Sequence, residues 1–115
     1  MPVQPLEEIE VYMIAEKLAD KWWEIVGRWK PFAQDTLGKQ LIRAIDSIGA
    51  NIAESYGSYH FGEKINLLYY ARGSLYESKF FACRASKRRL LTDAEFSEMM
   101  VDLQTLAPKL NAYIK

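Results

Sequence analysis

The sequence predicts an all-α protein, an antiparallel four-helix bundle with up-down-up-down topology. Four long segments place apolar residues three or four positions apart, which is the spacing of a buried stripe on a helix. The breaks between these segments are short, and short connections make consecutive helices antiparallel. No segment alternates apolar and polar residues between turn residues, so no β-strand is predicted.

Composition limits the class of protein. The 115 residues fit a single domain, 1–115, and half of them are hydrophobic, enough to build a core without disulfides or metals. Fifteen basic and fifteen acidic residues cancel, so no overall field attracts nucleic acid or anionic lipid. Such a partner would have to contact a local patch, and we expect no cofactor.

The compartment is inferred from cysteine usage and from hydrophobic runs. The single cysteine, Cys83, cannot form an intramolecular disulfide and suits a reducing cytosol. The segment Met1–Glu10 holds three glutamates and lacks the basic region that precedes the apolar stretch of a signal peptide. No uninterrupted apolar run approaches the ~20 residues of a membrane-spanning helix. We therefore expect a soluble, cytoplasmic protein with no membrane partner.

The first helix is expected over residues 5–28, with Pro5 in its first turn, where the missing N–H costs little. Two adjacent apolar stripes run along it. The main stripe consists of Val11, Ile14, Leu18, Trp22, Ile25 and Trp29, and the second of Ile9, Tyr12, Ala19, Trp23 and Val26. An apolar surface this wide indicates a contact beyond the core of one bundle.

The second helix is expected over residues 32–56 or 35–56, because Pro31 disfavours helix at the preceding residue and permits a new start after it. Its buried face is predicted to consist of Leu37, Leu41, Ile45, Ile48 and Ile52. Gly38 and Gly49 lie inside this helix, where each costs about 1 kcal/mol against alanine. We therefore expect a neighbouring helix to pack closely at both glycines.

The third helix is expected to begin between Ser58 and Gly62 and to reach Leu90. Its buried face is predicted to consist of Ile65, Leu68, Ala71, Leu75, Ala82 and Ala85, and further apolar surface comes from Tyr69, Tyr70, Tyr76, Phe80 and Phe81. Three tryptophans and seven tyrosines exceed what one thin bundle easily buries. We interpret the surplus as a surface for self-association, the alternative being a thick core with exposed tyrosine edges.

The fourth helix opens at Thr92, which is followed three residues later by Glu95 in the pattern of a capping box. Its apolar face is predicted to consist of Phe96, Met99, Leu103, Leu106, Leu110 and Tyr113. Pro108 falls inside this pattern and is expected to kink the helix or to end its regular part near Ala107.

Several motifs of the second and third helices are similar to those of a known family. They read Gln40-Leu41-Ile42-Arg43-Ala44, Ser47-Ile48, Asn51-Ile52-Ala53-Glu54 and, in the third helix, Ala71-Arg72-Gly73-Ser74-Leu75 with Glu77. In combination they resemble the bacterial four-helix-bundle family that includes proteins encoded in ribosomal-RNA intervening sequences and the accessory variability protein of diversity-generating retroelements. The likeness extends from Leu6 to about Leu110.

The resemblance implies an up-down-up-down bundle that has no enzymatic activity and assembles into a ring-like homopentamer. The retroelement members act as basic, nucleic-acid-binding partners of a reverse transcriptase. This chain departs from them in its balanced charge, and Ser55 and Gly57-Ser58 replace the glycine and Gly-Arg that commonly follow the Asn-Ile-Ala-Glu motif. Both departures favour a scaffold or protein-binding role over nucleic-acid binding.

Polar residues of the two middle helices form the first candidate site. They are Arg43, Asn51, Glu54, Arg72, Ser74 and Glu77. Ser47, Asn51 and Glu54 step by four and three, so they share a helix face that an antiparallel third helix can meet. We interpret the set as a partly buried network that fixes helix register or subunit contacts, because an unpaired buried charge costs several kcal/mol. The alternative is a functional site made from the same residues.

A basic cluster forms the second candidate site. It consists of Arg84, Lys87, Arg88 and Arg89, and residues 61–90 as a whole hold seven basic and two acidic residues. One interpretation is structural, because cations are favourable at a helix C-terminus. The alternative is contact with the phosphates of RNA or DNA, which a ring would strengthen by repeating the patch.

Catalytic and metal sites are not predicted. A di-iron bundle requires Glu-x-x-His on two helices, and the only histidine, His60, is not in such a motif. Cys83 and His60 lie ~35 Å apart along a continuous helix, too far for a nucleophile and its base. We therefore expect a non-enzymatic homo-oligomer, most simply a pentamer, that binds a partner protein or RNA. An enzyme with an unrecognised site is the remaining alternative.

Overall fold

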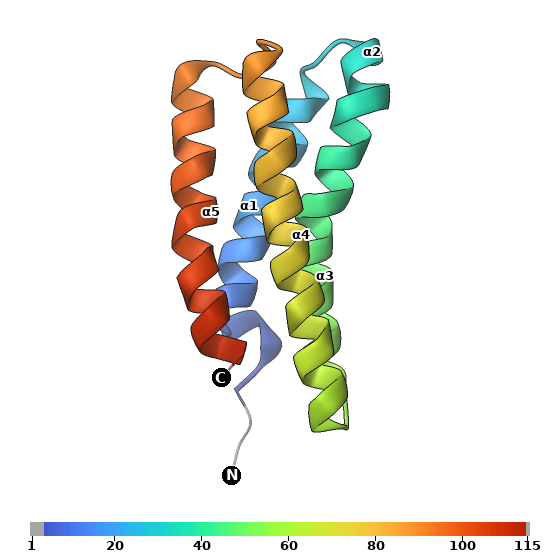
Figure 1. Cartoon of the computed structure of the whole chain (residues 1–115), viewed down its shortest axis with the longest axis vertical. Coiled ribbons are helices and arrows are strands. Elements are labelled where there is room, and N and C mark those ends of the chain that lie inside the picture. The colour runs from blue at the N-terminus through green and yellow to red at the C-terminus, as the bar shows by residue number, and fades with distance from the viewer. Residues whose placement is uncertain (1–3, 115) are drawn as a thin grey trace.

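Four long helices make up the computed structural model, which describes residues 4–114. They are α1 (Glu10–Gly27), α3 (Lys39–Gly57), α4 (Phe61–Lys87) and α5 (Asp93–Ile114). Consecutive helices run in opposite directions along an axis 48 Å long, so the predicted up-down-up-down bundle is confirmed (Figure 1). Between residues 4 and 114 there is no β-strand, and none of the helices combines the length and apolarity that a membrane crossing requires. The part of the N-terminal prediction that falls on Met1–Val3 lies outside the described residues.

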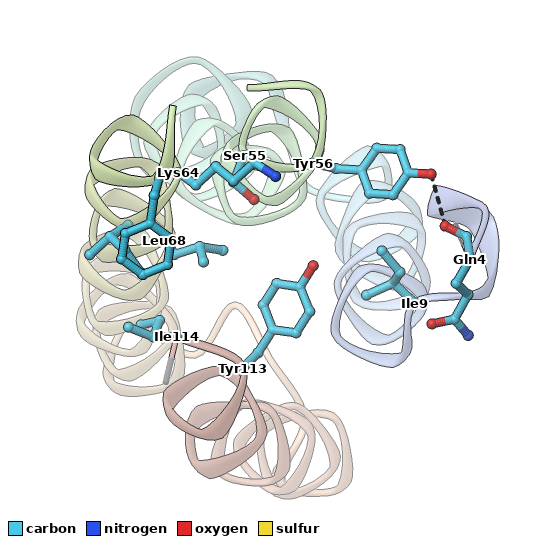
Figure 2. A pocket seen from close by; sticks show the side chains of 10 residues that line it. Gln4, Ile9, Ser55, Tyr56, Lys64, Leu68, Tyr113 and Ile114 are labelled. Carbon is cyan, nitrogen blue, oxygen red and sulfur yellow. Dashed lines mark hydrogen bonds between the residues drawn. The ribbon is translucent and has the colours of Figure 1, made fainter. Parts of the chain in front are cut away.

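The helices surround one core in the cyclic order α1, α3, α4, α5, as the end-on view of Figure 2 shows. The α3–α4 seam is the most extensive of the four, and the α1–α5 seam is the thinnest. Where α1 begins and α5 ends, Ile9, Leu68 and Tyr113 border an open cavity of about 400 Å³ (Figure 2). Tyr56 lies at its edge and donates a hydrogen bond from its hydroxyl to the carbonyl oxygen of Gln4 at 2.8 Å.

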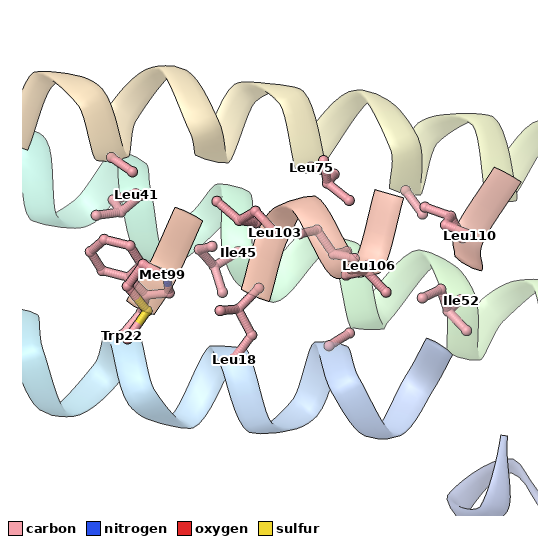
Figure 3. Packing of buried hydrophobic residues seen from close by; sticks show 14 of the residues in the cluster. Leu18, Trp22, Leu41, Ile45, Ile52, Leu75, Met99, Leu103, Leu106 and Leu110 are labelled. Carbon is pink, nitrogen blue, oxygen red and sulfur yellow. The ribbon is translucent and has the colours of Figure 1, made fainter. Parts of the chain in front are cut away.

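Most residues of the predicted apolar stripes lie in the core, and all four helices contribute to it. Among the exceptions, Trp23 and Tyr113 are exposed. The buried side chains labelled in Figure 3 are Leu18, Trp22, Leu41, Ile45, Ile52, Leu75, Met99, Leu103, Leu106 and Leu110. The inner face of α4 differs from the others because most of its buried residues are small: Ala71, Ser78, Ala82 and Ala85. These small side chains allow α3 to pack closely against α4, so the bulk of the core comes from the other helices.

The first helix begins later than predicted. Leu6–Glu8 forms a separate 3-10 turn, η1, and Ile9 has an extended backbone with φ −76° and ψ 123°. This break turns the Ile9 side chain into the bundle, where it is buried. Glu10 then stands in the first turn of α1, where a carboxylate is favoured by the helix dipole. The expected start at Pro5 is wrong, because the extended backbone of Ile9 separates the 3-10 turn from α1.

The connection from α1 to α3 is helical over most of its length. α2 (Pro31–Ala33) leads through a π-helical turn, η2 (Gln34–Gly38), directly into α3, so this helical segment starts slightly earlier than predicted. The Gln34 side-chain amide donates from Nε2 to the carbonyl oxygens of Val26 and Gly27, at 3.1 and 3.0 Å. It thereby caps carbonyl groups at the end of α1 that have no partner inside that helix.

A contact too close for a Cβ atom is found at Gly38 and not at Gly49. A Cβ atom on Gly38 would lie 2.8 Å from Val26 Cγ1 and 3.1 Å from the carbonyl oxygen of Ala33. A Cβ atom on Gly49 would lie 3.7 Å from Ala15 Cβ, an ordinary van der Waals distance. Only Gly38 is therefore required by its surroundings.

The C-terminus of α4 forms a Schellman cap. The N–H of Leu90 donates to the carbonyl oxygen of Ala85 at 2.9 Å, and the N–H of Arg89 donates to that of Ser86 at 3.0 Å. Arg89 has a φ of 60°, in the left-handed region that glycine normally occupies at this position. The helix therefore ends at Lys87, a few residues earlier than predicted, in a conformation that arginine tolerates less well than glycine.

The capping box at the start of α5 is confirmed. The N–H of Glu95 donates to Thr92 Oγ1 at 3.0 Å, and the N–H of Thr92 donates to Glu95 Oε1 at 2.9 Å. Of the two outcomes expected at Pro108, a kink or an end of the regular helix, the end near Ala107 is wrong, because α5 continues through Pro108. Pro108 is exposed and so is Gln104, whose carbonyl loses its helical partner there, so water can take that partner's place.

We expect Gly38→Ala to lower the free energy of unfolding by about 1–3 kcal/mol, because the added Cβ meets the stiff side chain of Val26 and a backbone carbonyl. Gly62→Ala is the matched control, because nothing lies within 4 Å of a Cβ at that helical position. It should stabilise the protein by about 0.4–1 kcal/mol. Denaturant unfolding measures both values, and equal stability of the two variants would contradict the close packing.

Candidate interaction surfaces

A chain of polar side chains crosses the α3–α4 seam. Asn51 donates from Nδ2 to the carbonyl oxygen of Ser47 at 2.8 Å and to Ser47 Oγ at 2.9 Å. On α4, Ser74 Oγ donates to Ser47 Oγ at 3.0 Å. All three residues are half-buried, so these bonds are partly shielded from water. Ser47 therefore connects the two helices. Its spacing of four from Asn51 already placed both residues on one face of the helix in the sequence.

The other candidate residues of the network lie apart from this chain of bonds. Arg72 donates from Nη1 to Asn111 Oδ1 on α5 at 3.1 Å, and its guanidinium carbon lies 4.8 Å from the centroid of the Tyr69 ring. Three of the candidates are exposed: Arg43, Glu54 and Glu77. Within residues 4–114, hydrogen bonds therefore link Asn51 to Ser74 through Ser47 and do not join all six residues.

Ion pairs connect α1 to α5. Lys21 Nζ lies 2.7 Å from Glu98 Oε1 and 2.9 Å from Asp102 Oδ2, and its hydrogen bonds to these carboxylates raise the pKa of Lys21. The seam holds two further pairs, Arg28 with Glu95 at 2.9 Å and Lys109 with Glu10 at 3.2 Å. These pairs are partly exposed, so each contributes at most about 1 kcal/mol. They place a basic group beside four carboxylates of α1 and α5: Glu10, Glu95, Glu98 and Asp102.

The outer side of α4 presents aromatic side chains to solvent. Tyr69, Tyr70, Tyr76 and Phe80 are between 45% and 66% exposed. A basic group lies near three of these rings: Arg72 at 4.8 Å from Tyr69, Lys79 at 5.5 Å from Tyr76 and Arg84 at 5.7 Å from Phe80. We call these four aromatic and three basic residues the outer α4 face.

The four aromatic residues of the outer α4 face give α4 apolar surface on a second side, and this side faces water. A helix of this kind is typically buried on both sides, and an exposed aromatic patch is typical of an interaction site. The spacing of residues in the sequence could have predicted this pairing of aromatic and basic side chains. Each of the three basic residues follows its aromatic neighbour by three or four positions, the spacing at which side chains meet on a helix.

The predicted basic cluster lies at the end of α4 and in the turn after it. Lys87, Arg88 and Arg89 are exposed there, as contact with phosphates would require. Arg84 is only half-exposed, and its Nε atom has no hydrogen-bond partner among the described residues. The cluster therefore divides into three exposed cations at the tip of the bundle and one arginine that belongs to the outer α4 face.

A second exposed aromatic site lies on the seam between α1 and α3. Trp23, from the second apolar stripe of the first helix, is 68% exposed and borders a hollow of about 300 Å³. The charged residues that line this hollow are basic, Lys39 and Arg43. Asp20 on α1 borders a different hollow, on the α5 side, together with Lys21 and Glu98. Partial burial and, second, the Asp20 carboxylate raise the pKa of Asp46. Neither carboxylate forms an ion pair within residues 4–114.

Metal-ligating and nucleophilic side chains are dispersed. Within residues 4–114, no group of three or more His, Cys, Asp or Glu residues is placed to hold a metal ion. His60 is exposed immediately before α4, and Cys83 is half-buried near the other end of that helix. The unbroken helix between them keeps the two side chains apart, by ~35 Å at 1.5 Å per residue.

Comparison with known proteins agrees with this architecture. The family model described as 23S rRNA-intervening sequence protein matches residues 7–112. A crystal structure of a protein of unknown function from the S23 ribosomal protein family of Bacteroides thetaiotaomicron VPI-5482 is similar, with a TM-score of 0.82 and 21% identity. The likeness covers 91% of this chain and 98% of that one, and at this identity it shows the fold. A comparison with curated proteins finds no match.

We expect Ser47→Ala and Ser74→Ala to be coupled by about 0.5–1.5 kcal/mol, the contribution of one neutral hydrogen bond. Denaturant unfolding of the wild type, the two single variants and the double variant measures this coupling. Glu54→Ala is the control, because Glu54 is exposed and should change stability by no more than about 0.5 kcal/mol. Strictly additive effects of the two serine substitutions would show that the bond across the seam does not stabilise the fold.

We expect Arg89→Gly to raise the free energy of unfolding by about 1 kcal/mol, because glycine adopts the left-handed cap conformation without strain. Arg88→Gly removes the same charge at a neighbouring residue with a φ of −88°, so it should give no such gain. Thermal unfolding of the two variants distinguishes backbone strain from charge. An equal gain in both variants would assign the effect to charge.

Proposed function

The chain belongs to the family of 23S rRNA-intervening sequence proteins, and we propose that it acts as a homo-oligomeric scaffold or binding protein without catalytic activity. The proposed assembly is a pentameric ring, the state implied by the motif resemblance of the second and third helices. Each surface of the chain is repeated around such a ring, so weak contacts with another macromolecule, a protein or an RNA, add up.

The outer α4 face supports self-association most strongly. The chain has a complete core without it, because the opposite side of α4 already packs against the other helices. In a single chain the four aromatic side chains of this face would remain in contact with water. Several exposed aromatic side chains on one side of a helix are typical of a protein interface.

The absence of catalysis is proposed from the arrangement of the polar side chains. Ser47, Asn51 and Ser74 meet between helices and use their hydrogen-bonding groups on one another. His60 and Cys83 lie toward opposite ends of α4. A hydrolytic activity that copurifies with the homogeneous protein and disappears on Cys83→Ala would contradict this part of the proposal.

Size-exclusion chromatography with light scattering tests the oligomer. We expect a mass near five times the 13.3 kDa of one chain, and we expect Phe80→Glu to lower it because a charge enters the outer α4 face. Phe32→Glu is the matched control, since Phe32 is 82% exposed but lies in α2. A wild-type mass of one chain would overturn self-association, and a different multiple would overturn the pentamer alone.

Nucleic-acid binding at the tip of α4 is the second candidate function, as in the accessory proteins of retroelement reverse transcriptases. Arg89 favours it, because arginine holds a left-handed backbone where glycine would be more stable. A residue kept in an unfavourable backbone conformation is a signal of function. Lys87 and Arg88 are exposed beside it, so three cations are available to phosphates.

Titration of a structured RNA and a duplex DNA at two salt concentrations tests this candidate. Removing two cations with Arg88→Ala and Arg89→Ala should reduce the slope of log K against log salt by about 2. Lys64→Ala, near the other end of α4, is the control. No binding at low salt, or an unchanged slope in the double variant, would exclude phosphate contact at this cluster.

A further inference from the structure

The cavity at the end of the bundle where α1 begins and α5 ends has apolar walls. They are formed by Ile9, Ile65, Leu68 and Ile114, with Phe61 exposed at the rim. The end-on view of Figure 2 shows the cavity between the helix ends. At about 400 Å³ it falls in the size range of pockets that hold small molecules, and the space between the helices of a bundle is a common place for such a pocket.

Lys64 is the one charged side chain among the described residues that line this cavity. It is half-buried and forms no ion pair within residues 4–114. Figure 2 shows its side chain extending from α4 toward Ser55 at the end of α3. Glu63, the next residue in the chain, does not line the cavity and accepts a hydrogen bond from Ser58 at 3.3 Å. A positive charge without a counter-charge among the described residues favours a negatively charged ligand.

Three hydroxyl groups border the cavity, and they differ in what they can still bind. The Ser55 hydroxyl donates to a backbone carbonyl oxygen of α3 at 2.7 Å, and the Tyr56 hydroxyl donates to that of Gln4 at 2.8 Å. The Tyr113 hydroxyl points into the cavity and forms no hydrogen bond with the other residues drawn in Figure 2. Partial burial and, second, Tyr56 raise the pKa of Tyr113, so its hydroxyl keeps the proton near neutral pH. The cavity therefore offers two donors, the Lys64 ammonium and the Tyr113 hydroxyl.

We propose that this cavity binds a small carboxylic acid with an apolar chain, of the size of a medium-chain fatty acid. The carboxylate accepts hydrogen bonds from the Lys64 ammonium and the Tyr113 hydroxyl, and the chain lies against the apolar walls. A carboxylate suits these groups because it only accepts hydrogen bonds, and because bonds between charged partners are the stronger ones. A ligand held inside one chain requires neither the proposed oligomer nor the nucleic-acid contact.

Other classes of ligand fit this cavity less well. A nucleotide or a sugar phosphate would place its remaining polar groups against Ile65 and Leu68, and burial of polar groups without partners is unfavourable. An amphipathic helix of a partner protein requires a groove along a surface, whereas helix ends surround this cavity (Figure 2).

A hollow of about 430 Å³ at the other end of the bundle is the competing site for the same ligand. It is lined by Phe32, Leu37 and Arg88 among others. Arg88 is exposed, and the Thr36 hydroxyl already donates to the carbonyl oxygen of Phe32 at 2.7 Å. This hollow therefore lacks the second donor that Tyr113 supplies in the cavity.

Titrations followed by methyl NMR test both the ligand class and the place of binding. Octanoate should shift the methyl signals of Ile65 and Ile114 and leave those of Leu37 unchanged. Octanol has the same chain without the charge and should bind roughly tenfold more weakly. Acetate has the charge without the chain and should bind roughly a hundredfold more weakly or not at all, because each buried methylene adds to affinity.

Each contrary result of these titrations overturns the proposal. They are the absence of octanoate binding, equal affinities for octanoate and octanol, and shifts at Leu37 without shifts at Ile65.

Two substitutions test the groups that hold the carboxylate. Lys64→Met removes the charge and keeps an unbranched apolar stem, and Tyr113→Phe removes only the hydroxyl. Each should weaken octanoate binding roughly tenfold, and Lys64→Met should leave the affinity for octanol unchanged. Circular dichroism and thermal melting verify that both variants fold. Arg88→Met is the matched control, because it removes the cation of the opposite hollow and should leave octanoate binding unchanged.

The contrary outcomes for the variants are equally definite. Wild-type affinity in both Lys64→Met and Tyr113→Phe would show that these groups do not hold the carboxylate. Loss of octanoate binding in Arg88→Met alone would move the site to the opposite hollow.

Light scattering separates the ligand from the oligomer. The mass of the protein should be the same with and without octanoate. A fall in mass on octanoate binding would show that another copy occupies the cavity and would overturn the small-molecule proposal. A monomeric wild type that binds octanoate would overturn the proposed oligomer and support the cavity as a binding site.

Discussion

Close approach of α3 and α4 is the contact on which the rest of the bundle depends. α4 presents mainly alanine and serine to the core, so α3 lies against it and Ser47 reaches Ser74 across the seam. The volume that these small side chains leave is filled from the other helices, above all by Trp22 and the leucines of α5 (Figure 3). A larger residue at Ala71 or Ala82, both fully buried, would force neighbouring side chains and backbone to shift.

The same constraint shapes the surface of α4. Because small residues occupy its inner side, the large apolar side chains of this helix stand mostly outside, on the outer α4 face. The two sides of α4 thus have different roles in our interpretation: the inner side sets the distance between helices, and the outer side offers area to another molecule. The exterior of the α1–α5 seam differs from that of α4, since it carries ion pairs.

The fold was predictable because local signals agreed with one another: the period of the apolar residues, the capping box and short breaks all indicated the same bundle. The surfaces were less predictable because spacing identifies a helix face but not the partner that a long side chain reaches. Arg72 was assigned to the two middle helices, yet it bonds to Asn111 on α5. Likewise, Trp22 and Trp23 belong to adjacent stripes, and only the packing of whole helices decides that one is buried and the other exposed.

The three tryptophans differ in exposure, so their fluorescence reports on different parts of the bundle. Trp22 lies in the middle of the core, Trp29 is buried at the bend after α1, and Trp23 is open to water. Indole emission shifts with the polarity around the ring, and a dissolved quencher reaches only rings that it can touch. The emission and quenching of Trp23 therefore report whether the α1–α3 seam is covered. Those of Trp22 should change only when the helices separate. A change in the exposure of this seam and unfolding of the bundle should thus be distinguishable in the unlabelled protein from its own fluorescence.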